Sequence, residues 1–341
     1  MKEYIPSLNG LRAISIILVL FAHVVLKNFH FIENPGGQIG VTIFFIISGY
    51  LITLLLLKEE ETKGTISLRS FYIRRTIRIF PIYYFLLAVY LILQLAGVLN
   101  FSTNSWITSL TYTKYFTVTN GSEWESGHLW SLSIEEHFYL IWPLIFKFLK
   151  KYRIFLAFAI IIIVTLIRLV TDVSVMHILT RGDALMWGCV FAIYSNRLMF
   201  FLNSIKKEFQ LVPFIILLLV LAFKRFFTLM GAHEYENWVT TFFGSYGLLT
   251  NLSVGFVILI SIHCSNTVWY RFLNNGILNY IGKLSYSIYL WQQLFFSSRL
   301  ERLSSFPYNI VAIFIVAFLS FNLVEKPFLN LRSRLNPILK K

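Results

Sequence analysis

Residues 39–57 read IGVTIFFIISGYLITLLLL, nineteen residues without one charged side chain. A helix of about twenty apolar residues crosses the ~30 Å hydrocarbon core of a bilayer. In lipid, only helices and closed barrels satisfy their own backbone polar groups. The apolar run is continuous and does not alternate with polar residues, as a barrel strand would. This segment therefore predicts a transmembrane helix.

Similar apolar segments recur through the 341 residues, of which 57% are hydrophobic and 13% charged, with a mean hydropathy of +0.69. This composition is far more apolar than that of a typical soluble domain. It predicts an all-α fold, a polytopic integral membrane bundle of about ten transmembrane helices. These are expected near Leu8–Leu26, Ile39–Leu57, Ile77–Ala96, Leu129–Leu149, Ile154–Thr171, Ile178–Phe201, Leu211–Leu229, Tyr246–His263, Ile277–Phe296 and Ile310–Leu323.

The chain shows no low-complexity tract and no clear internal repeat, so residues 1–341 are expected to form a single membrane domain with no appended soluble domain. The first apolar run contains Arg12 and His23 and has no small-residue cleavage site after it, so we expect it to be retained. Cys189 and Cys264 lie in or beside apolar segments and are expected to be packing residues.

The net charge of +14 would suggest a nucleic-acid partner in a soluble protein, but the positions of the basic residues favour a membrane protein. Segment 97–127 has Lys114 against Glu123 and Glu125 and is expected on the outer side. Both termini are then cytoplasmic, and no nucleic-acid partner is expected. The residues that mark the cytoplasmic side are Lys58, Lys63, Arg69, Arg74, Arg75, Lys147, Lys150, Lys151, Arg153, Arg197, Lys206, Lys207, Arg332, Arg334, Lys340 and Lys341.

Arg12 and His23 lie in the first expected helix, about 16 Å apart along one face and about 20° from eclipsed. An ionisable side chain at the bilayer centre costs at least ~2.5 kcal/mol, so it indicates a function unless it snorkels to the interface. A desolvated, neutral imidazole can take a proton from a hydroxyl, which makes His23 a candidate general base. The alternative is that Arg12 anchors the helix and His23 is a satisfied polar contact.

Ser48 lies in the middle of the second expected helix, where a serine is a conceivable nucleophile but commonly hydrogen-bonds to its own helix. Packing is therefore the default interpretation. Arg75 and Arg78 share one face at the start of the third helix, and their two guanidinium groups could bind phosphates. The alternative for this pair is contact with lipid headgroups.

Glu135 and Glu136 lie about two turns into the fourth expected helix. Adjacent helical residues point about 100° apart, so at most one of the two carboxylates readily faces His23, and periodicity does not tell which. A second set of ionisable residues is expected on the same outer side. These residues are expected to pair with one another, either at an acceptor site or as a structural ion network. They are Arg168, Arg181 and Asp183.

The polar segment 281–293 either lines a cavity or joins helices through its hydroxyl groups. The histidines show no metal-ligand spacing, so no metal site is expected. Four sequence motifs follow one another in a characteristic order. They are Arg12-x10-His23, GVTIFFIISG at residues 40–49, Arg75-x2-Arg78, and WSLSIEEHFY at residues 130–139. Together they resemble the membrane-bound acyltransferase-3 family over nearly the whole chain.

The resemblance implies a bacterial multi-pass enzyme of the cytoplasmic membrane that takes an acyl group from cytoplasmic acyl-CoA, usually acetyl-CoA. The acyl group would pass to a hydroxyl of a cell-surface glycan or lipid-linked saccharide, with no bound cofactor. His23 would be the catalytic residue, as general base or transient acyl carrier, oriented by Glu135 or Glu136. Three arginines and one serine are assigned to donor binding: Arg12, Ser48, Arg75 and Arg78.

The chain departs from the family at two places. Gln292 and Gln293 stand where many relatives have His-Trp, which puts a proton-transfer role there in doubt. The chain also stops at Lys341 without the hydrolase-like domain of some relatives, so it is expected to act alone or with a separate extracytoplasmic partner. The competing class is a transporter or flippase of an anionic or sugar-linked substrate, which also uses ionisable residues at the midplane.

Overall fold

The protein is described by a computed structural model, with backbone only for residues 25–28, 201–204, 301–302 and 332–335. The residues described are 5–28, 36–117, 124–171, 173–174, 176–204, 211–231, 235–264 and 267–335. All regular structure within these ranges is helical, which confirms the all-α prediction. Five residues used above to orient the chain lie outside the described ranges: Glu123, Lys206, Lys207, Lys340 and Lys341.

Six of the described helical stretches are long and apolar enough to cross a membrane, so the chain is a membrane protein. They are Gly36–Lys63, Leu68–Leu95, Lys150–Val170, Val212–Leu229, Glu236–His263 and Tyr308–Leu331. A shorter apolar helix covers Leu8–Val24. The expected number of about ten spans and the cytoplasmic location of the termini stay predictions.

The chain divides into two compact units. Unit 1 comprises Met1–Gly64 and Ile145–Lys283, and unit 2 comprises Thr65–Leu144 and Leu284–Lys341. Two helices contribute residues to both units: α6 (Leu129–Phe148) and α14 (Gly276–Phe296). The other elements of unit 1 are α1 (Leu8–Asn28), α2 (Gly36–Lys63), η3 (Lys150–Tyr152), α7 (Arg153–Val170), α8 (Ile178–Ile193), α9 (Ser195–Ser204), α10 (Val212–Leu229), α11 (Glu236–Phe243), α12 (Leu248–His263) and α13 (Val268–Leu273).

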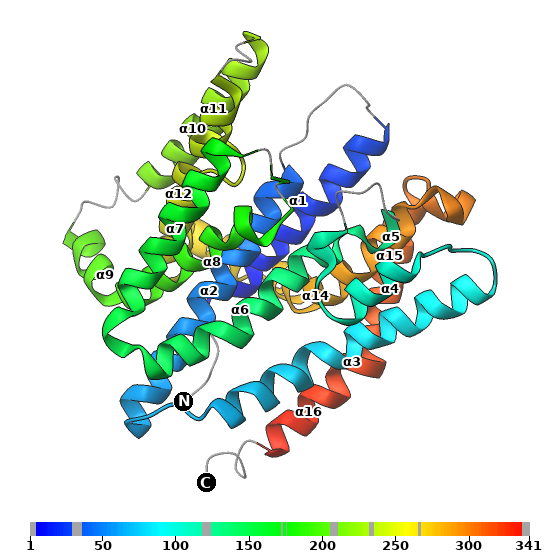
Figure 1. The fold of residues 1–341 in the computed structure, drawn as a ribbon, viewed down its shortest axis with the longest axis horizontal. Helices are drawn as coiled ribbons and strands as arrows, with labels where there is room; N and C mark the ends of the chain where they lie inside the picture. The colour runs from blue at the N-terminus through cyan, green and yellow to red at the C-terminus, as the bar shows by residue number, and fades with distance from the viewer. Residues whose placement is uncertain are drawn as a thin grey trace. The chain divides into compact units, whose positions relative to one another are not determined.

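The core of unit 1 is built around α2, which packs against α1 and α8 (Figure 1). Glycines allow the backbones of α2 and α8 to approach closely. A Cβ added to Gly188 would overlap the carbonyl of Ile46 and the backbone nitrogen of Tyr50, and one added to Gly49 would overlap the carbonyl of Leu185. Small residues at such crossings are typical of membrane helix pairs. Cys189, next to this crossing, is buried and free, as expected of a packing residue.

Two of the expected spans of unit 1 differ in detail from the structure. The sixth, Ile178–Phe201, is divided at Tyr194, where α8 ends and α9 begins one residue later. Ser195 and Asn196 favour such a boundary because their side chains compete for backbone hydrogen bonds. The eighth begins at Leu248, because Gly244 and Gly247 adopt extended conformations between α11 and α12.

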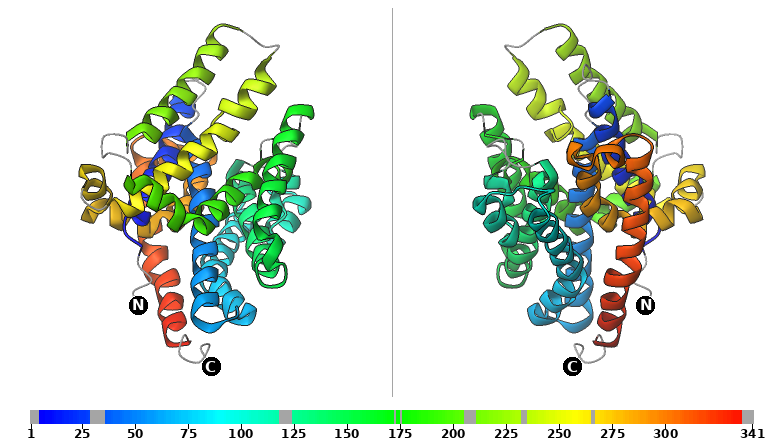
Figure 2. Two further views of the ribbon diagram at one scale, coloured as in Figure 1. Left: turned by 90° about the vertical axis from the view of Figure 1, so that its left-hand side faces the viewer. Right: turned by 90° about the vertical axis from the view of Figure 1, so that its right-hand side faces the viewer.

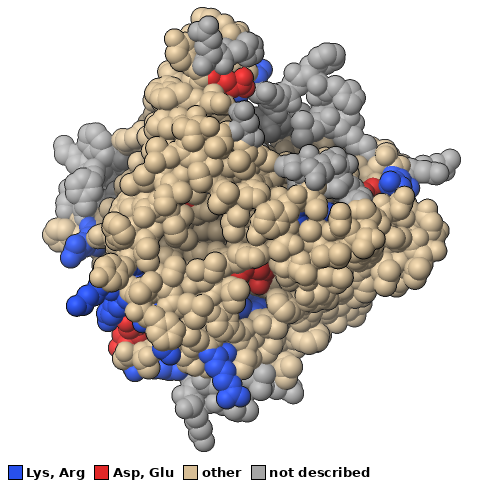
Figure 3. Space-filling view, in the orientation of Figure 1, with Lys and Arg blue, Asp and Glu red and all other residues tan. Residues whose placement is uncertain are grey.

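A cluster of ions lies where α2 ends, close to the turn between α6 and α7. Glu60 Oε2 lies 2.8 Å from Arg153 Nη1, and Glu60 Oε1 lies 3.1 Å from Lys150 Nζ. Arg153 also donates a hydrogen bond to the carbonyl of Phe146 and lies over the ring of that residue. These segments are at the lower left of Figure 1, where Figure 3 shows Lys and Arg gathered on an otherwise largely uncharged face.

Unit 2 is organised around α3 and the carboxy-terminal helices, and α16 runs beside α3 (Figure 1). Its remaining elements are α3 (Leu68–Leu95), α4 (Thr103–Leu110), η1 (Lys114–Phe116), α5 (Trp124–Gly127), η6 (Ser298–Ser304), α15 (Tyr308–Ser320), the π-helical turn η7 (Phe321–Glu325) and α16 (Lys326–Leu335). Figure 2 shows α15, η7 and α16 as one continuous column of helix, coloured orange to red.

The π-helical turn ends two residues before Pro327, which has no N–H to donate to the carbonyl four residues earlier and so disturbs the α-helical ladder. The residue before this turn and the last residue of the turn have buried side chains that bond to α14. Trp291 Nε1 donates to Ser320 Oγ at 2.9 Å, and Ser287 Oγ donates to Glu325 Oε2 at 3.0 Å. These two bonds hold the column against α14.

Candidate functional site

Arg75 lies where α3 meets α6 in unit 2. Its guanidinium carbon lies 4.9 Å from the centroid of the Tyr139 ring, in a cation–π arrangement. One turn away, the Tyr72 hydroxyl donates to the carbonyl of Leu140 at 2.8 Å, which fixes α3 against α6 at this level. Arg78 follows Arg75 by three residues on α3 and is partly exposed. Arg75 of the predicted donor motif therefore contacts the helix that carries both glutamates.

Like its neighbour Glu135, Glu136 lies on α6 in unit 2 and is partly exposed. It interacts electrostatically with Arg75 and with the phenols of Tyr83 and Tyr84 on α3. It also acts on Tyr112, which lies just after α4. Arg75, a predicted donor-binding residue, and Glu136, a predicted catalytic residue, therefore interact electrostatically within unit 2. These interactions do not single out one of the two glutamates, because Glu135 in turn acts on the phenol of Tyr286.

The polar residues of α14 join it to the start of α6. The Tyr289 hydroxyl lies 2.6 Å from Ser131 Oγ and donates to the carbonyl of His128 at 3.2 Å. Gln293 Oε1 accepts a hydrogen bond from the backbone N–H of His128 at 2.6 Å. Of the two interpretations of this segment, these residues support the joining of helices. Gln293, which stands with Gln292 at the first departure from the family pattern, therefore has a structural contact.

Lys114, which belongs to the segment predicted on the outer side, is buried. Its exposed fraction is 0%, Nζ donates to Ser105 Oγ at 2.5 Å, and its backbone N–H donates to Ser133 Oγ at 3.2 Å. Nearby in the chain, Glu125 is also buried and accepts from Ser297 Oγ and from Arg299 Nε at 2.5 Å and 3.1 Å. No local pattern distinguishes these two from exposed loop charges.

Unit 1 contains the other predicted catalytic and donor residues. Arg12 and His23 lie on the continuous helix α1 and are both partly exposed, so the spacing expected for one helical face is kept. Ser48 lies on α2 and is also partly exposed. The two helices meet at Gly40, where a Cβ would lie 2.6 Å from the carbonyl oxygen of Ser15. His23 belongs to unit 1 and both glutamates belong to unit 2.

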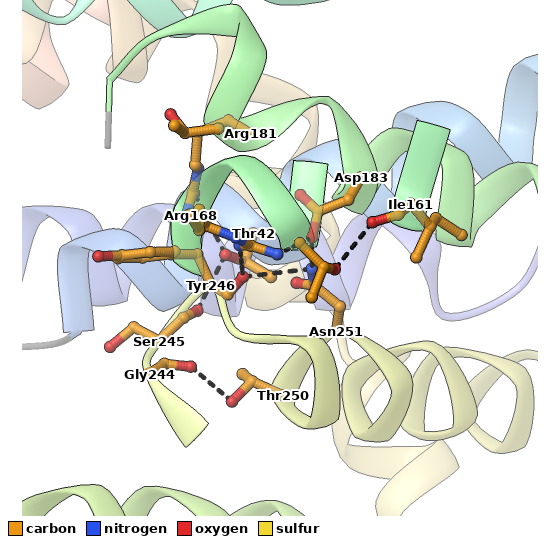
Figure 4. Close-up of polar contacts among 12 residues, drawn as sticks. Thr42, Ile161, Arg168, Arg181, Asp183, Gly244, Ser245, Tyr246, Thr250 and Asn251 are labelled. Atoms are coloured by element: carbon orange, nitrogen blue, oxygen red, sulfur yellow. Dashed lines mark hydrogen bonds and ion pairs between the residues drawn. The ribbon is translucent and has the colours of Figure 1, made fainter. Parts of the chain in front are cut away.

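A buried ion pair joins α7 to α8 in unit 1 (Figure 4). Arg168 Nη2 lies 2.5 Å from Asp183 Oδ2, and Asn251 Nδ2 donates to the same oxygen at 2.9 Å. Arg168 Nη1 donates to the carbonyl of Tyr246, also at 2.5 Å. The expected mutual pairing is present for these two ions. Asn251, on α12, was missed, although an amide within an apolar helix is itself a signal.

Arg181 makes a separate set of contacts in the same region (Figure 4). It is fully buried, donates from Nη2 to Thr42 Oγ1 at 3.2 Å and lies 4.9 Å from the centroid of the Tyr246 ring. Thr42 in turn donates to the carbonyl of Ser245 at 3.0 Å. Arg181 therefore joins α8 to α2. Among the described residues, no three His, Cys, Asp or Glu side chains are grouped so that they could hold a metal ion.

Comparison with known proteins adds a finding that geometry does not supply. Residues 5–324 match the Acyl_transf_3 family, described as an acyltransferase domain. "Peptidoglycan O-acetyltransferase OatA" of Listeria monocytogenes serovar 1/2a (strain ATCC BAA-679 / EGD-e) is 32% identical over 361 aligned positions, covering 96% of this chain and 56% of that protein. "Putative O-acetyltransferase SACOL0978" of Staphylococcus aureus (strain COL) is 32% identical over 321 positions, covering 85% and 50%.

The chain spans about half the length of the curated relatives it matches. No solved structure matches it.

Proposed function

This chain belongs to the acyltransferase-3 family, and we propose that it moves an acyl group, most simply acetyl, from acyl-CoA to a hydroxyl of a cell-surface glycan or lipid-linked saccharide. The peptidoglycan O-acetyltransferase among its relatives supports a glycan acceptor and an acetyl donor. The proposal includes a multi-pass location in the bacterial cytoplasmic membrane with both termini inside, which the cluster of basic residues near the end of α2 supports.

The reaction itself is an acyl exchange between sulfur and oxygen. The hydroxyl oxygen of the acceptor attacks the thioester carbonyl carbon, a C–O bond forms, and the C–S bond breaks. The proton of the hydroxyl ends on the coenzyme A thiolate, so no oxidant or further reactant is needed. A base that removes this proton during the attack lowers the barrier, typically by a factor of 10² to 10⁴.

In the proposal, His23 is that base, or carries the acyl group for part of the reaction. Glu135 or Glu136 orients its imidazole by accepting a hydrogen bond from the second ring nitrogen, which selects the reactive tautomer. The phosphates of coenzyme A bind to guanidinium groups, which form bidentate hydrogen bonds to phosphate oxygens. The residues proposed for this donor site are Arg12, Ser48, Arg75 and Arg78.

One observation carries the proposal beyond family membership. Arg75 lies over the ring of Tyr139 and acts electrostatically on Glu136, which stands one turn before Tyr139 on α6. Two helices of unit 2 that contact each other through Arg75 and Tyr139 thus carry a cation suited to phosphate and a carboxylate suited to orienting a base. The Arg168–Asp183 pair is proposed to be structural, because both ions are buried and directly paired.

The test uses the purified protein in proteoliposomes with acetyl-CoA labelled in the acetyl group. Release of the coenzyme A thiol and transfer of label to peptidoglycan fragments are measured together. We expect both for the wild type and neither for His23→Ala. The matched control is His263→Ala, an exposed histidine at the end of α12, which should keep wild-type rates.

The same assay separates the competing mechanisms. Label bound to His23 in a single turnover without acceptor supports the covalent route, and its absence supports direct transfer. Movement of intact substrate across the membrane without thiol release would instead identify a transporter and would overturn the proposal.

A further inference from the structure

Tyr112 has a backbone conformation that is unusual for an aromatic residue. It follows α4 in unit 2 with φ of 55°, in the left-handed region that residues with a Cβ rarely adopt. Its side chain is 7% exposed, and its ring lies 4.2 Å from that of Tyr83 and 5.7 Å from that of Phe80 by their centroids, nearly parallel to both. The ring is therefore held in one place by stacking on α3.

The hydroxyl group of Tyr112 differs from those of its neighbours. The Tyr83 hydroxyl donates to the carbonyl of Ser109 at 2.7 Å, and the Tyr84 hydroxyl donates to the carbonyl of Leu110 at 3.3 Å. The Tyr112 hydroxyl is buried and has no hydrogen-bond partner among the described residues. A buried donor without a partner weakens the fold, and strained conformations cluster at functional sites. Stability therefore does not account for the placement of this hydroxyl.

Tyr112 stacks on α3, the helix that also carries Arg75 of the proposed donor site. Its phenol interacts electrostatically with Glu136, and Glu136 interacts with Arg75. The proposed donor-binding arginine, the carboxylate and the phenol all belong to unit 2. A fixed O–H donor in the unit that holds Arg75 matches one recurrent requirement of acyl transfer, which is a hydrogen bond to the oxygen that becomes negative.

We propose that Tyr112 is a further catalytic residue, whose hydroxyl donates a hydrogen bond to the oxygen of the acyl group while the acyl carbon is tetrahedral. The inference rests on the proposed acyl transfer. When the nucleophile adds to the carbonyl carbon, the carbonyl electron pair moves to this oxygen, and the phenol stabilises it without losing its proton. When the intermediate collapses, the thiolate leaves, the carbonyl forms again and Tyr112 is unchanged.

The decisive variant is Tyr112→Phe, which removes only the oxygen and keeps the stacked ring. Loss of one such donor lowers kcat by about 10² to 10³ in other acyl-transfer enzymes, so we expect a fall of that order with KM for acetyl-CoA nearly unchanged. Thermal stability should not fall, because the hydroxyl has no partner to lose. Thiol release and thermal unfolding in detergent are measured on the same preparation.

Tyr83→Phe is the matched control, since it removes a hydroxyl from the ring stacked on Tyr112. It should lower the unfolding temperature, because the carbonyl of Ser109 loses its donor, and leave kcat within a few-fold of wild type. A Tyr112→Phe protein with wild-type kcat, or with only a raised KM, overturns the inference while the proposed function stands. A wild-type protein that releases no thiol overturns the proposed function, and the inference falls with it.

Discussion

Arg168 on α7 and Asp183 on α8 form an ion pair with a nitrogen-to-oxygen distance of 2.5 Å, and their side chains are 5% and 1% exposed. Removing one partner of a buried pair leaves an uncompensated charge and costs about 3–5 kcal/mol. We therefore expect Asp183→Asn to lower the unfolding temperature and the folded yield in detergent strongly. The double variant Arg168→Met with Asp183→Leu should recover part of the loss. An Asp183→Asn protein of wild-type stability but low activity would instead favour an acceptor-side role.

Gly188 and Gly182 on α8 provide a matched pair for the contact between α2 and α8. A Cβ at Gly188 would overlap the backbone of Ile46 and Tyr50, whereas one at Gly182 would meet nothing within 4 Å. Overpacking costs about 1–3 kcal/mol or more, while Ala in an open helix position gains up to ~1 kcal/mol over Gly. Gly188→Ala should therefore lower the unfolding temperature and Gly182→Ala should not. Equal stability of the two variants would contradict the close approach of the helices.

Arg75 should determine the affinity for the acyl donor. A hydrogen bond to a charged group contributes about 1.5–3 kcal/mol, so Arg75→Ala should raise KM for acetyl-CoA by at least about tenfold. Arg75→Lys keeps the charge but loses the planar group over Tyr139, and should recover only part of the affinity. Arg69→Ala, an exposed position on the same helix, is the control and should leave KM unchanged. An equal rise in KM for Arg75→Ala and Arg69→Ala, with wild-type KM for Arg75→Lys, would instead indicate an effect of general surface charge.

Glu60 should stabilise unit 1 through its bonds to Arg153 and Lys150. Glu60→Gln weakens a charge-assisted hydrogen bond to a nearly buried guanidinium, so we expect a loss of about 1–3 kcal/mol in the free energy of unfolding. The neighbouring Glu61 is exposed, and Glu61→Gln should have little effect. Chemical unfolding in detergent measures both, and identical curves for the two variants would show that the ion pair contributes nothing.

The helices could be predicted from the sequence because the length of an apolar segment is a local property. Residues 39–57 lie within α2, and 8–26 lie within α1. The division at Tyr194 was missed because the apolar pattern continues across it. The apolar pattern of a segment therefore predicts where a helix lies better than it predicts where the helix is interrupted.

Candidate site residues could be predicted from the sequence only where the residue type itself suggests a chemical role. Arg75 and the glutamates stand out as charges in apolar surroundings. Tyr112 does not, because a buried, unpartnered hydroxyl and a positive φ arise from contacts between segments distant in the sequence. The choice between Glu135 and Glu136 stays a prediction, because periodicity alone does not make it.

The π-helical turn at Phe321–Glu325 determines the direction of the two side chains that bond to α14. Ser287 and Trp291 are four residues apart on α14, while their partners Glu325 and Ser320 are five apart. In an uninterrupted α-helix, residues five apart point about 140° away from each other, so the two bonds could not face one neighbour. The wider turn, with its i to i+5 repeat, brings them to a common side. The π-helical turn accommodates one extra residue. With Leu323 removed, Ser320 and Glu325 would be four positions apart, so a regular α-helix should keep both bonds to α14.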